Sequence, residues 1–413
     1  MTELDTLQFC HSLCSKNMEK LHLLYMKKGF VLYIIILSIF VACQSPKKEE
    51  KGQLEAQGPI HVKAFYEEGK YGGWPANWGV WSWGNEILVG FTKADHKEKE
   101  RSHTFDQESS RAMFARSMDG GKTWSTEDGY AQGIAEQTVE HNLGDLSKPA
   151  TELKESINFL DPNFAFTFRM IHMLEGPSSF YYSYDRGKSW KGAFKLDVDF
   201  APRKPKGVVS RTDYIVDGKH SMTAFLTVGF MEGDTNWREV ACVRTEDGGL
   251  TWKHLSWIGP EKVNSIMPGS VRLDESTLLC MIRRTKPPEM ASYVSNDNGL
   301  IWNKLPDPVK VDANGNPPAL LKLQDGRLCL VYGLRRKETR PEGIGMYVTY
   351  SSDQGQTWTE PELLRGNDGA VWDIGYPRAV ELPDGRVVTL YYYNNADAGD
   401  PYRYIAATIF TTK

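Results

Sequence analysis

Short apolar runs separated by turn-forming residues dominate the chain from Ile60 to its carboxyl end. Representative runs are 86–91, 222–228, 277–282, 328–332 and 387–393. Runs of this length, bounded by Gly, Asp, Asn and Pro, are typical of β-strands, and no long segment shows the 3.6-residue period of an amphipathic helix. The pattern therefore predicts an all-β fold for residues 59–413.

One eight-residue pattern recurs along this region. It begins with Ser or Thr, places Asp at its third position and Gly at its fifth, and ends in Trp. Its copies are 117–124, 183–190, 245–252, 295–302 and 351–358. Asp can bond back to the backbone and Gly accepts positive φ, so the pattern predicts a tight hairpin turn. We expect the Trp to fill the apolar space beneath its own hairpin.

The spacing of these turns indicates the architecture. Successive copies begin 50 to 66 residues apart, which is close to the length of a four-stranded propeller blade. We expect a six-bladed β-propeller of four-stranded antiparallel blades, five of them with the turn between their two outer strands and a sixth, over 373–410, without it. A strand at 60–66 is expected to pair into the sixth blade, because closing the ring removes open sheet edges. Seven blades are the alternative, but the spacing favours six.

The recurring turn is the Asp-box, or BNR, repeat, and residues 59–413 resemble the sialidase-like β-propellers. In that family the repeat is structural and faces away from the catalytic mouth. The resemblance therefore implies the fold and a mouth at the opposite rim, whereas the activity depends on other residues.

Composition narrows the function without deciding it. The chain is 40% hydrophobic and 25% charged, and its formal net charge is −4. This balance excludes a broad basic surface for nucleic acid but leaves room for a local basic pocket. Cys242, Cys280 and Cys329 lie in apolar runs, where buried free thiols are expected. No Cys/His spacing indicates a metal site. We expect no cofactor, and a monomer whose partner is a glycan.

The amino end is interpreted as an export signal followed by a tether. Met26 begins a basic segment, an apolar run covers 30–42, and Cys43 follows a small residue. This arrangement resembles a bacterial lipoprotein signal over residues 1–43, with translation starting at Met26 and lipid attached to Cys43. The alternative is an ordinary signal anchor. Residues 44–58 are polar and are expected to form a flexible tether, so the protein is expected to be exported and held in the cell envelope, at the periplasm or the surface.

The resemblance also implies two catalytic groups. In sialidases the nucleophilic tyrosine precedes a Leu-Pro-Asp-Gly turn of the last blade, and Tyr376 has that position ahead of 382–385. Their acid/base aspartate lies in the first-blade loop before a strand that ends in an Asp box, where this chain has Asp106. His103 adds a residue type that titrates near neutrality. A packed tyrosine and a solvated loop carboxylate are the structural alternatives.

Arginines at strand ends and loops are the candidates for binding a substrate carboxylate. A guanidinium can bind a carboxylate through two parallel hydrogen bonds, and Arg284 and Arg335 lie where sialidases carry two of their three carboxylate-binding arginines. The alternative is that these arginines simply face solvent at the ends of strands. The complete set of candidate binding residues in these segments is Arg211, Arg284, Arg335 and Arg378, with Asp373 close to Tyr376 in the sequence.

Two departures from sialidases change the expected substrate. Their Arg-Ile-Pro motif, the source of the first arginine, has no counterpart near Trp74, and the glutamate that acts as base to the tyrosine is absent from 265–269. Trp74 and Trp78 could stack a sugar ring while Asn77 binds its hydroxyls, with core packing as the alternative. We therefore expect sialosides to be poorer substrates than another sugar, such as a uronate or a deoxy sugar.

Three functions remain open from the sequence. The first is a sialidase-like glycoside hydrolase with Asp106 as acid/base and Tyr376 as nucleophile or cation stabiliser. The second is a polysaccharide lyase, in which His103 or Tyr376 removes the proton next to a uronate carboxylate. The third is a glycan-binding propeller without catalysis.

The export signal leads to a direct prediction. Cys43→Ala should abolish lipid labelling and release the protein from the membrane fraction, because the cysteine thiol is the atom that carries the lipid. Metabolic labelling with a fatty acid and membrane fractionation measure both effects. Undiminished labelling of the variant would refute the lipoprotein assignment.

Overall fold

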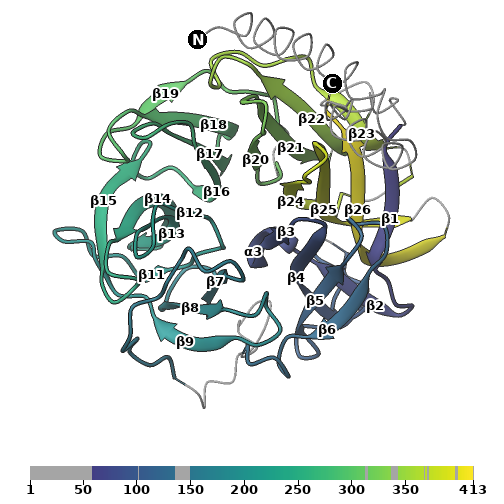
Figure 1. Ribbon diagram of the computed structural model, residues 1–413, viewed down its shortest axis with the longest axis horizontal. Coiled ribbons are helices and arrows are strands. Elements are labelled where there is room, and N and C mark those ends of the chain that lie inside the picture. Colours follow the sequence, from purple (N-terminus) through teal and green to yellow (C-terminus); the bar gives the residue numbers. More distant parts are fainter. Residues whose placement is uncertain are drawn as a thin grey trace, which may run out of the picture. The chain divides into compact units, whose positions relative to one another are not determined.

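The computed structural model describes residues 58–100, 102–134, 149–311, 315–335, 343–366, 368–369, 372–395 and 399–412. The expected signal, Cys43 and all but the last residue of the tether lie outside these residues. Over the described ranges, six sheets form a ring (Figure 1), and the one helix among them is the four-residue α3 (Pro75–Trp78). None of the described helices is long and apolar enough to span a bilayer. The predicted all-β, six-bladed propeller is confirmed.

The blades follow one another along the chain. The first blade contains β2 (Lys70–Gly73), β3 (Val80–Trp83), β4 (Glu86–Asp95), β5 (Arg111–Ser117) and β6 (Ser125–Asp128). The second contains β7 (Ala165–Met170), β8 (Ser178–Ser183) and β9 (Lys191–Lys195). The third contains β10 (Val198–Asp199), β11 (Gly207–Val208), β12 (Tyr214–Val216), β13 (Met222–Glu232), β14 (Thr235–Thr245) and β15 (Trp252–Ile258).

The remaining three blades have four strands each. The fourth contains β16 (Ser265–Arg272), β17 (Leu278–Thr285), β18 (Pro288–Ser295) and β19 (Asn303–Leu305). The fifth contains β20 (Ala319–Lys322), β21 (Leu328–Leu334), β22 (Gly345–Ser351) and β23 (Glu362–Gly366). The sixth contains β24 (Gly375–Glu381), β25 (Arg386–Asn395), β26 (Asp400–Thr411) and, from the other end of the domain, β1 (Ile60–Phe65).

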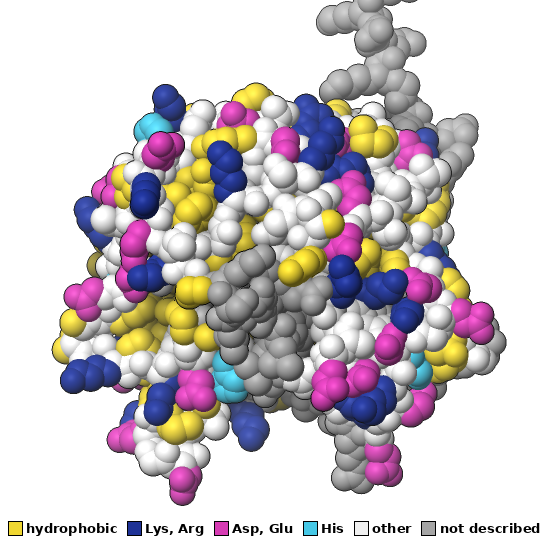
Figure 2. All heavy atoms as spheres, turned by 90° about the horizontal axis from the view of Figure 1, so that it is seen from below, with side chains coloured by type: hydrophobic (Ala, Val, Ile, Leu, Met, Phe, Trp, Pro, Cys, Tyr) yellow, Lys and Arg dark blue, Asp and Glu magenta, His cyan; other side chains and the backbone are white. Residues whose placement is uncertain are grey.

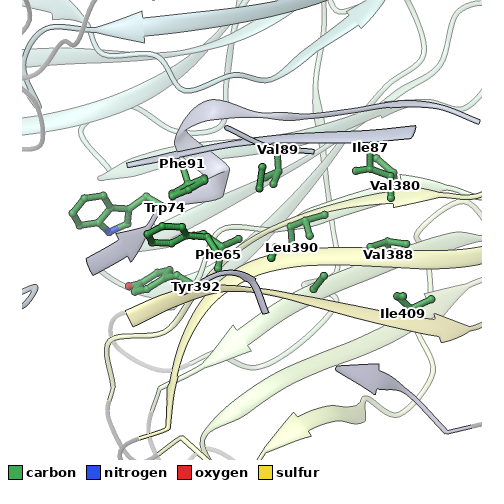
Figure 3. Close-up of a cluster of buried hydrophobic side chains, with 14 of the residues drawn as sticks. Phe65, Trp74, Ile87, Val89, Phe91, Val380, Val388, Leu390, Tyr392 and Ile409 are labelled. Carbon is green, nitrogen blue, oxygen red and sulfur yellow. The ribbon is translucent and has the colours of Figure 1, made fainter. Parts of the chain in front are cut away.

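The expected closing strand is present. β1 pairs antiparallel with β26, with Ile60 opposite Ile409 and Phe65 opposite Ile405. A cluster of buried apolar side chains fills the space between the first and sixth blades (Figure 3), where Val89 of β4 and Leu390 of β25 are fully buried. The sheet pairing and this core together join the two ends of the ring.

The five Asp boxes share one hydrogen-bond pattern. In each, the Ser or Thr hydroxyl accepts the amide of the Gly four residues later at 2.8–2.9 Å and donates to the Asp carboxylate at 2.7–2.9 Å. Burial raises the pKa of Asp119, but the hydrogen bonds it accepts lower it to about 2. The turn is therefore specified locally, by the residues of the repeat itself.

The Trp of the box does not pack as the sequence suggested. Trp190 of the second blade stacks on Phe114 of the first, with ring centres 5.4 Å apart. Trp252 of the third blade lies 6.0 Å from Phe168 of the second, and Trp302 of the fourth reaches the third in the same way. These three indoles therefore fill space between blades, whereas Trp124 and Trp358 also donate Nε1 to a carbonyl of their own box, at 2.8 Å and 3.2 Å.

The second blade differs from the others in one respect that matters for the site. The box at 183–190 joins β8 to β9, so β7 corresponds to the second strand of the other blades, and no described strand pairs with its inner edge. Helix α3 and Thr212 cover that edge instead: Thr167 Oγ1 donates to Trp78 O at 2.9 Å, and Phe168 N donates to Thr212 Oγ1 at 3.2 Å. This arrangement draws α3 toward the centre of the ring (Figure 1).

Two sequence expectations about the rest of the domain agree with the structure. Cys242, Cys280 and Cys329 are buried free thiols. The face shown in Figure 2 carries interspersed basic and acidic side chains, with no continuous basic area among the described residues in that view.

The inter-blade role of the Trp can be measured. Trp190→Ala should lower the free energy of unfolding by about 3–5 kcal/mol, because it empties a buried site between two blades. Leu300→Ala is the matched control: Leu300 lies in another Asp box but is 55% exposed, so its loss should cost less than about 0.5 kcal/mol. Denaturant titration measures both, and equal effects would contradict the assignment.

Candidate active site

Strand register places the Asp boxes and the candidate site at opposite rims. Ser295, the first residue of its box, pairs with Leu278 at the start of β17. Arg283 lies near the far end of β17, and Arg335 directly follows β21 in the same manner. Both arginines are therefore at the rim opposite the turns.

Tyr376 stands at the start of the inner strand β24 with its hydroxyl beside an arginine. Arg283 Nη1 donates to Tyr376 Oη at 3.1 Å, and the guanidinium carbon of Arg335 lies 5.3 Å from the centre of the Tyr376 ring. Arg335 is fixed by hydrogen bonds of 3.0 Å to Ile374 O and to Tyr392 Oη. Arg283 and Arg335 are only 7% and 4% exposed, so their charges act on Tyr376 with little screening.

These charges alter the acidity of the tyrosine. Burial raises the pKa of Tyr376, but the positive charges of Arg283 and Arg335, together with the electrostatic effect of His103, outweigh it, so the pKa falls from 10.0 to about 7. A phenolate is then accessible near neutral pH. The glutamate expected by comparison with sialidases is not needed for this ionisation.

A buried carboxylate ties His103 to the same cluster. His103 Nδ1 lies 2.6 Å from Asp373 Oδ1, which also accepts the hydroxyl of Tyr392 at 2.5 Å. Burial raises the pKa of Asp373, but His103 and Arg403 lower it to about 2, so it is ionised. With Nδ1–H donated to Asp373, any proton exchange of His103 with a substrate would take place at Nε2. His103 and Asp373, both candidates from the sequence, are thus brought together.

Asn316 holds the backbone of the tyrosine. Tyr376 has φ 52, a left-handed conformation uncommon for a residue with a side chain. Its amide donates to Asn316 Oδ1 at 2.7 Å, and Asn316 is fully buried. Gly333 and Gly375 make room for the amide, since a Cβ on them would lie 2.6 Å and 1.9 Å from it. The strained backbone at Tyr376 is therefore fixed from the fifth blade.

Two of the predicted arginines lie apart from this cluster. Arg284 bonds Glu289 at 2.6 Å and Ser265 at 3.2 Å, so its charge is paired away from Tyr376. Arg378 donates to Ala76 O at 2.9 Å and lies 3.9 Å from Asp213. It lines a cavity of about 250 Å³ on the propeller axis, together with residues of β3, β12, β16 and β20.

The remaining candidates for sugar binding are largely covered. Trp74 and Trp78 are 1% and 0% exposed, so neither offers an open ring face for stacking, and the packing alternative is the one observed. Trp74 packs edge to face on His103, with ring centres 5.0 Å apart. Asn77 Oδ1 accepts Arg211 Nε at 3.4 Å. Arg211, which precedes β12 of the third blade, therefore contacts α3 through Asn77.

Asp106 occupies a different environment from His103. It is partly exposed, and its carboxylate lies 3.6 Å from Lys97 Nζ. Its backbone amide donates to Asp95 O at 2.8 Å, which holds the loop against β4. Among the described residues, no hydrogen bond or ion pair joins Asp106 to Tyr376, Asp373 or His103.

Two residues of the Tyr376 cluster, Arg283 and Asn316, were not among the predicted site residues. Arg283 and Arg284 are neighbours in β17 and point to opposite faces of the sheet. The sequence alone does not show which of the two faces Tyr376. Asn316 precedes Pro317 and Pro318 in a loop without a motif. Arg169, within β7, lies 3.3 Å above the ring of Trp78, outside the Tyr376 cluster. No group of three His, Cys, Asp or Glu side chains suited to a metal occurs within the described ranges.

Comparison with known proteins places this geometry in context. Residues 166–389 match the model of a family described as the BNR repeat-like domain. No curated protein sequence matches the chain. A solved structure of a Dyadobacter fermentans protein of unknown function is similar, with a TM-score of 0.61 and 22% identity over 86% of this chain and 100% of that one.

Two enzymes of known activity share the fold. The Hadza microbial sialidase Hz136 has a TM-score of 0.57 and 14% identity over 85% of this chain and 68% of that one. The α-L-arabinofuranosidase Arb93A from Fusarium graminearum has a TM-score of 0.52 and 12% identity over 84% of this chain and 98% of that one. At these identities the likeness concerns the fold alone.

The ionisation of Tyr376 is directly measurable. Near-ultraviolet absorbance of tyrosinate should show one group titrating at a pKa of about 7, while ordinary tyrosines titrate near 10. Tyr376→Phe should remove this signal. Arg283→Gln should raise its midpoint by about one pH unit or more, because a positive charge and a charge-assisted hydrogen bond are lost.

A matched control comes from the neighbouring strand. Tyr391 is buried and bonds Thr408 at 2.6 Å, so Tyr391→Phe should leave the low midpoint unchanged. A midpoint near 10 in the unmodified protein would contradict the electrostatic account.

Proposed function

The chain belongs to the family of proteins with a BNR repeat-like domain, and we propose that it is a glycoside hydrolase acting on an acidic glycan. The observation that supports this proposal is the contact of Tyr376 with Arg283, beside the His103–Asp373 pair. It supplies a nucleophile and a proton-transfer group at one rim of the propeller. Cleavage of a glycosidic bond by a two-step mechanism uses both, the nucleophile at the anomeric carbon and the proton-transfer group at the departing oxygen.

The proposed reaction has two steps. Tyr376 Oη, ionised beside Arg283, attacks the anomeric carbon, the glycosidic C–O bond breaks, and His103 Nε2 gives its proton to the departing oxygen. Water then attacks the anomeric carbon, His103 takes the water proton, and the bond to Tyr376 breaks to restore the phenolate. Asp373 stabilises the imidazolium through its 2.6 Å contact with Nδ1.

The arginines account for the preference for an acidic substrate. Arg335 is fixed beside Tyr376 by its bonds to Ile374 O and Tyr392 Oη, and Arg283 donates to Tyr376 Oη. A carboxylate on the sugar would be attracted by the combined charge of the two arginines. The alternative is that both arginines only lower the pKa of Tyr376 and do not contact the substrate. These roles differ in their consequences, because a carboxylate contact affects acidic substrates selectively.

His103 replaces Asp106 as the proposed proton donor. His103 contacts Asp373 within the cluster, whereas the recorded partner of Asp106 is Lys97. The resemblance to sialidases favours Asp106, and the contacts favour His103. Export and lipid attachment at Cys43 remain part of the proposal, on the strength of the amino-terminal sequence.

A lyase is the second candidate. A tyrosine of lowered pKa can also remove the proton next to a uronate carboxylate that arginines neutralise. The products separate the two reactions, since only elimination creates an unsaturated sugar that absorbs in the near ultraviolet. Glycan binding without turnover is the third outcome.

The test is a substrate screen with matched variants. The purified protein is assayed on sialosides, uronides and neutral aryl glycosides, by released aglycone and by absorbance of an unsaturated product. We expect uronides or deoxy sugars to exceed sialosides. Tyr376→Phe and His103→Gln should each lower kcat by about two orders of magnitude or more. Arg335→Gln should lower kcat on every substrate at neutral pH, because the charge of Arg335 helps to ionise Tyr376, and should in addition raise KM on acidic substrates only.

Controls assign the roles. Tyr391→Phe removes a hydroxyl from an adjacent buried tyrosine outside the cluster and should retain activity. If Asp106→Ala costs as much as His103→Gln, the proton donor is Asp106 instead. Full activity in Tyr376→Phe would refute the proposed site, and efficient release of sialic acid would refute the expected substrate preference.

A further inference from the structure

The cavity on the propeller axis lies between the two rims of the ring. It is lined by inner strands of five blades, β3, β12, β16, β20 and β24, and is partly open to solvent. Tyr376 stands at one end of β24, and Leu382, just past the other end, lies under Gly120 of the first Asp box. Arg378, which lines the cavity, is between them. The lining residues do not include Tyr376, Arg283, Arg335 or His103.

The cavity is large enough for a small organic molecule. Its volume is about 250 Å³, whereas one water takes about 30 Å³ in the liquid, so roughly eight waters would fill it. Val80, Trp81 and Leu320 contribute apolar walls, and Asp213 and Arg378 contribute opposite charges. Apolar walls with a few convergent polar groups are typical of sites for small ligands.

The carboxylate of Asp213 is only partly satisfied by the protein. Asp213 is 7% exposed, and Ser270 Oγ donates to its Oδ2 at 2.8 Å. Its Oδ1 accepts no hydrogen bond from a described residue, because Arg378 Nη1 is 3.9 Å away. Burial raises the pKa of Asp213 from 3.8 to about 7, although Arg378 and Ser270 lower it. The partners within the protein therefore stabilise this charge incompletely.

Arg378 is held on one side and has N–H groups to spare on the other. Nη2 donates to Ala76 O at 2.9 Å and also to Thr212 O. Nη1 donates to no described residue, and Nε is buried without a partner there. The guanidinium is thus fixed in position while Nη1, its closest atom to Asp213, remains available to a ligand.

The gap between these two groups suits a hydroxyl. An oxygen placed about 2.8 Å from each of Nη1 and Oδ1 spans their 3.9 Å separation with an angle of about 90° at that oxygen. A hydroxyl accepts from Nη1 and donates to Oδ1 at the same time, whereas an ammonium only donates and a carboxylate only accepts. Water has the same capacity, but a single bridging water leaves most of the cavity volume unused.

The charges of the lining favour a neutral ligand. A cation would be opposed by Arg378, and Asp213 is the one carboxylate in the lining. An anion would be opposed by Asp213. A molecule with several hydroxyls and an apolar C–H surface matches both the polar pair and the apolar walls.

We propose that the axial cavity binds a small neutral polyol of up to monosaccharide size, through a hydroxyl that bridges Asp213 and Arg378. This site is additional to the proposed reaction and does not rest on it, because none of the groups assigned to that reaction lines the cavity.

The test measures binding to the unmodified full-length protein. Glucose and myo-inositol, which have no glycosidic bond to cleave, are titrated by isothermal calorimetry at constant ionic strength, with sodium acetate and calcium chloride as charged probes. We expect saturable binding of at least one polyol and no saturable binding of acetate or calcium at the same concentrations. Tyr376→Phe should bind the polyol as tightly as the unmodified protein.

A charge-balanced double variant locates the site. Asp213→Asn with Arg378→Gln should weaken polyol binding at least tenfold, because hydrogen bonds to two charged groups are lost. Asp217→Asn with Arg272→Gln is the matched control: it alters an ion pair between the same two blades, Asp217 in the third and Arg272 in the fourth, outside the cavity lining, and should leave binding unchanged.

A crystal structure of the unmodified protein soaked with the polyol decides the matter if the double variant does not fold. A polyol hydroxyl between Asp213 and Arg378 supports the proposal, and water alone in the cavity overturns it. Absence of saturable polyol binding, binding that survives the Asp213→Asn/Arg378→Gln change, or equal binding of acetate or calcium would each overturn it as well. Because no reaction is measured, these outcomes are independent of the substrate screen.

Discussion

Pairing between β1 and β26 is the constraint on which the site depends. It joins the two ends of the domain, so that the first blade and the sixth share one core. Figure 3 shows Trp74 and Tyr392 together at one end of that core. His103 of the first blade can therefore reach Asp373 of the sixth, although the two are far apart in sequence. Without closure, His103 and Tyr376 would lie on separate edges of the domain.

The fold could be predicted because its information is local and repeated. Each Asp box carries its own turn chemistry, and five copies fix the blade length and the position of the outer hairpin. Tyr376 is a candidate because of its order relative to the Asp384–Gly385 turn, and His103 because of its residue type in a long loop. The Trp of the box was misplaced because a periodic pattern describes one blade and contains nothing about the face of its neighbour.

The arginines show where sequence reasoning ends. Arg283 and Arg284 are adjacent, and successive strand residues point to opposite faces. A register shift opposite them, between Ile266 and Pro268 of β16, adds an irregularity that no sequence pattern indicates. Arg283 contacts Tyr376 and Arg284 pairs with Glu289. Likewise, Trp74 and Trp78 were candidates for stacking on a sugar, but both are buried where α3 covers the edge of β7 with which no described strand pairs.

The absence of a glutamate base has a physical substitute. A carboxylate next to a tyrosine takes up its proton, whereas buried arginines stabilise the phenolate that remains after the proton has left. Stabilisation by arginines requires that their charges be buried, where water screens them little. Arg283 and Arg335 meet this requirement, because both are buried at the ends of strands. This stabilisation also requires the tyrosine to stay within reach of those charges, and the left-handed backbone fixed by Asn316 keeps it there. Under the proposed function, a site without that glutamate is therefore compatible with a reactive tyrosine, because Arg283 and Arg335 lower the pKa of Tyr376.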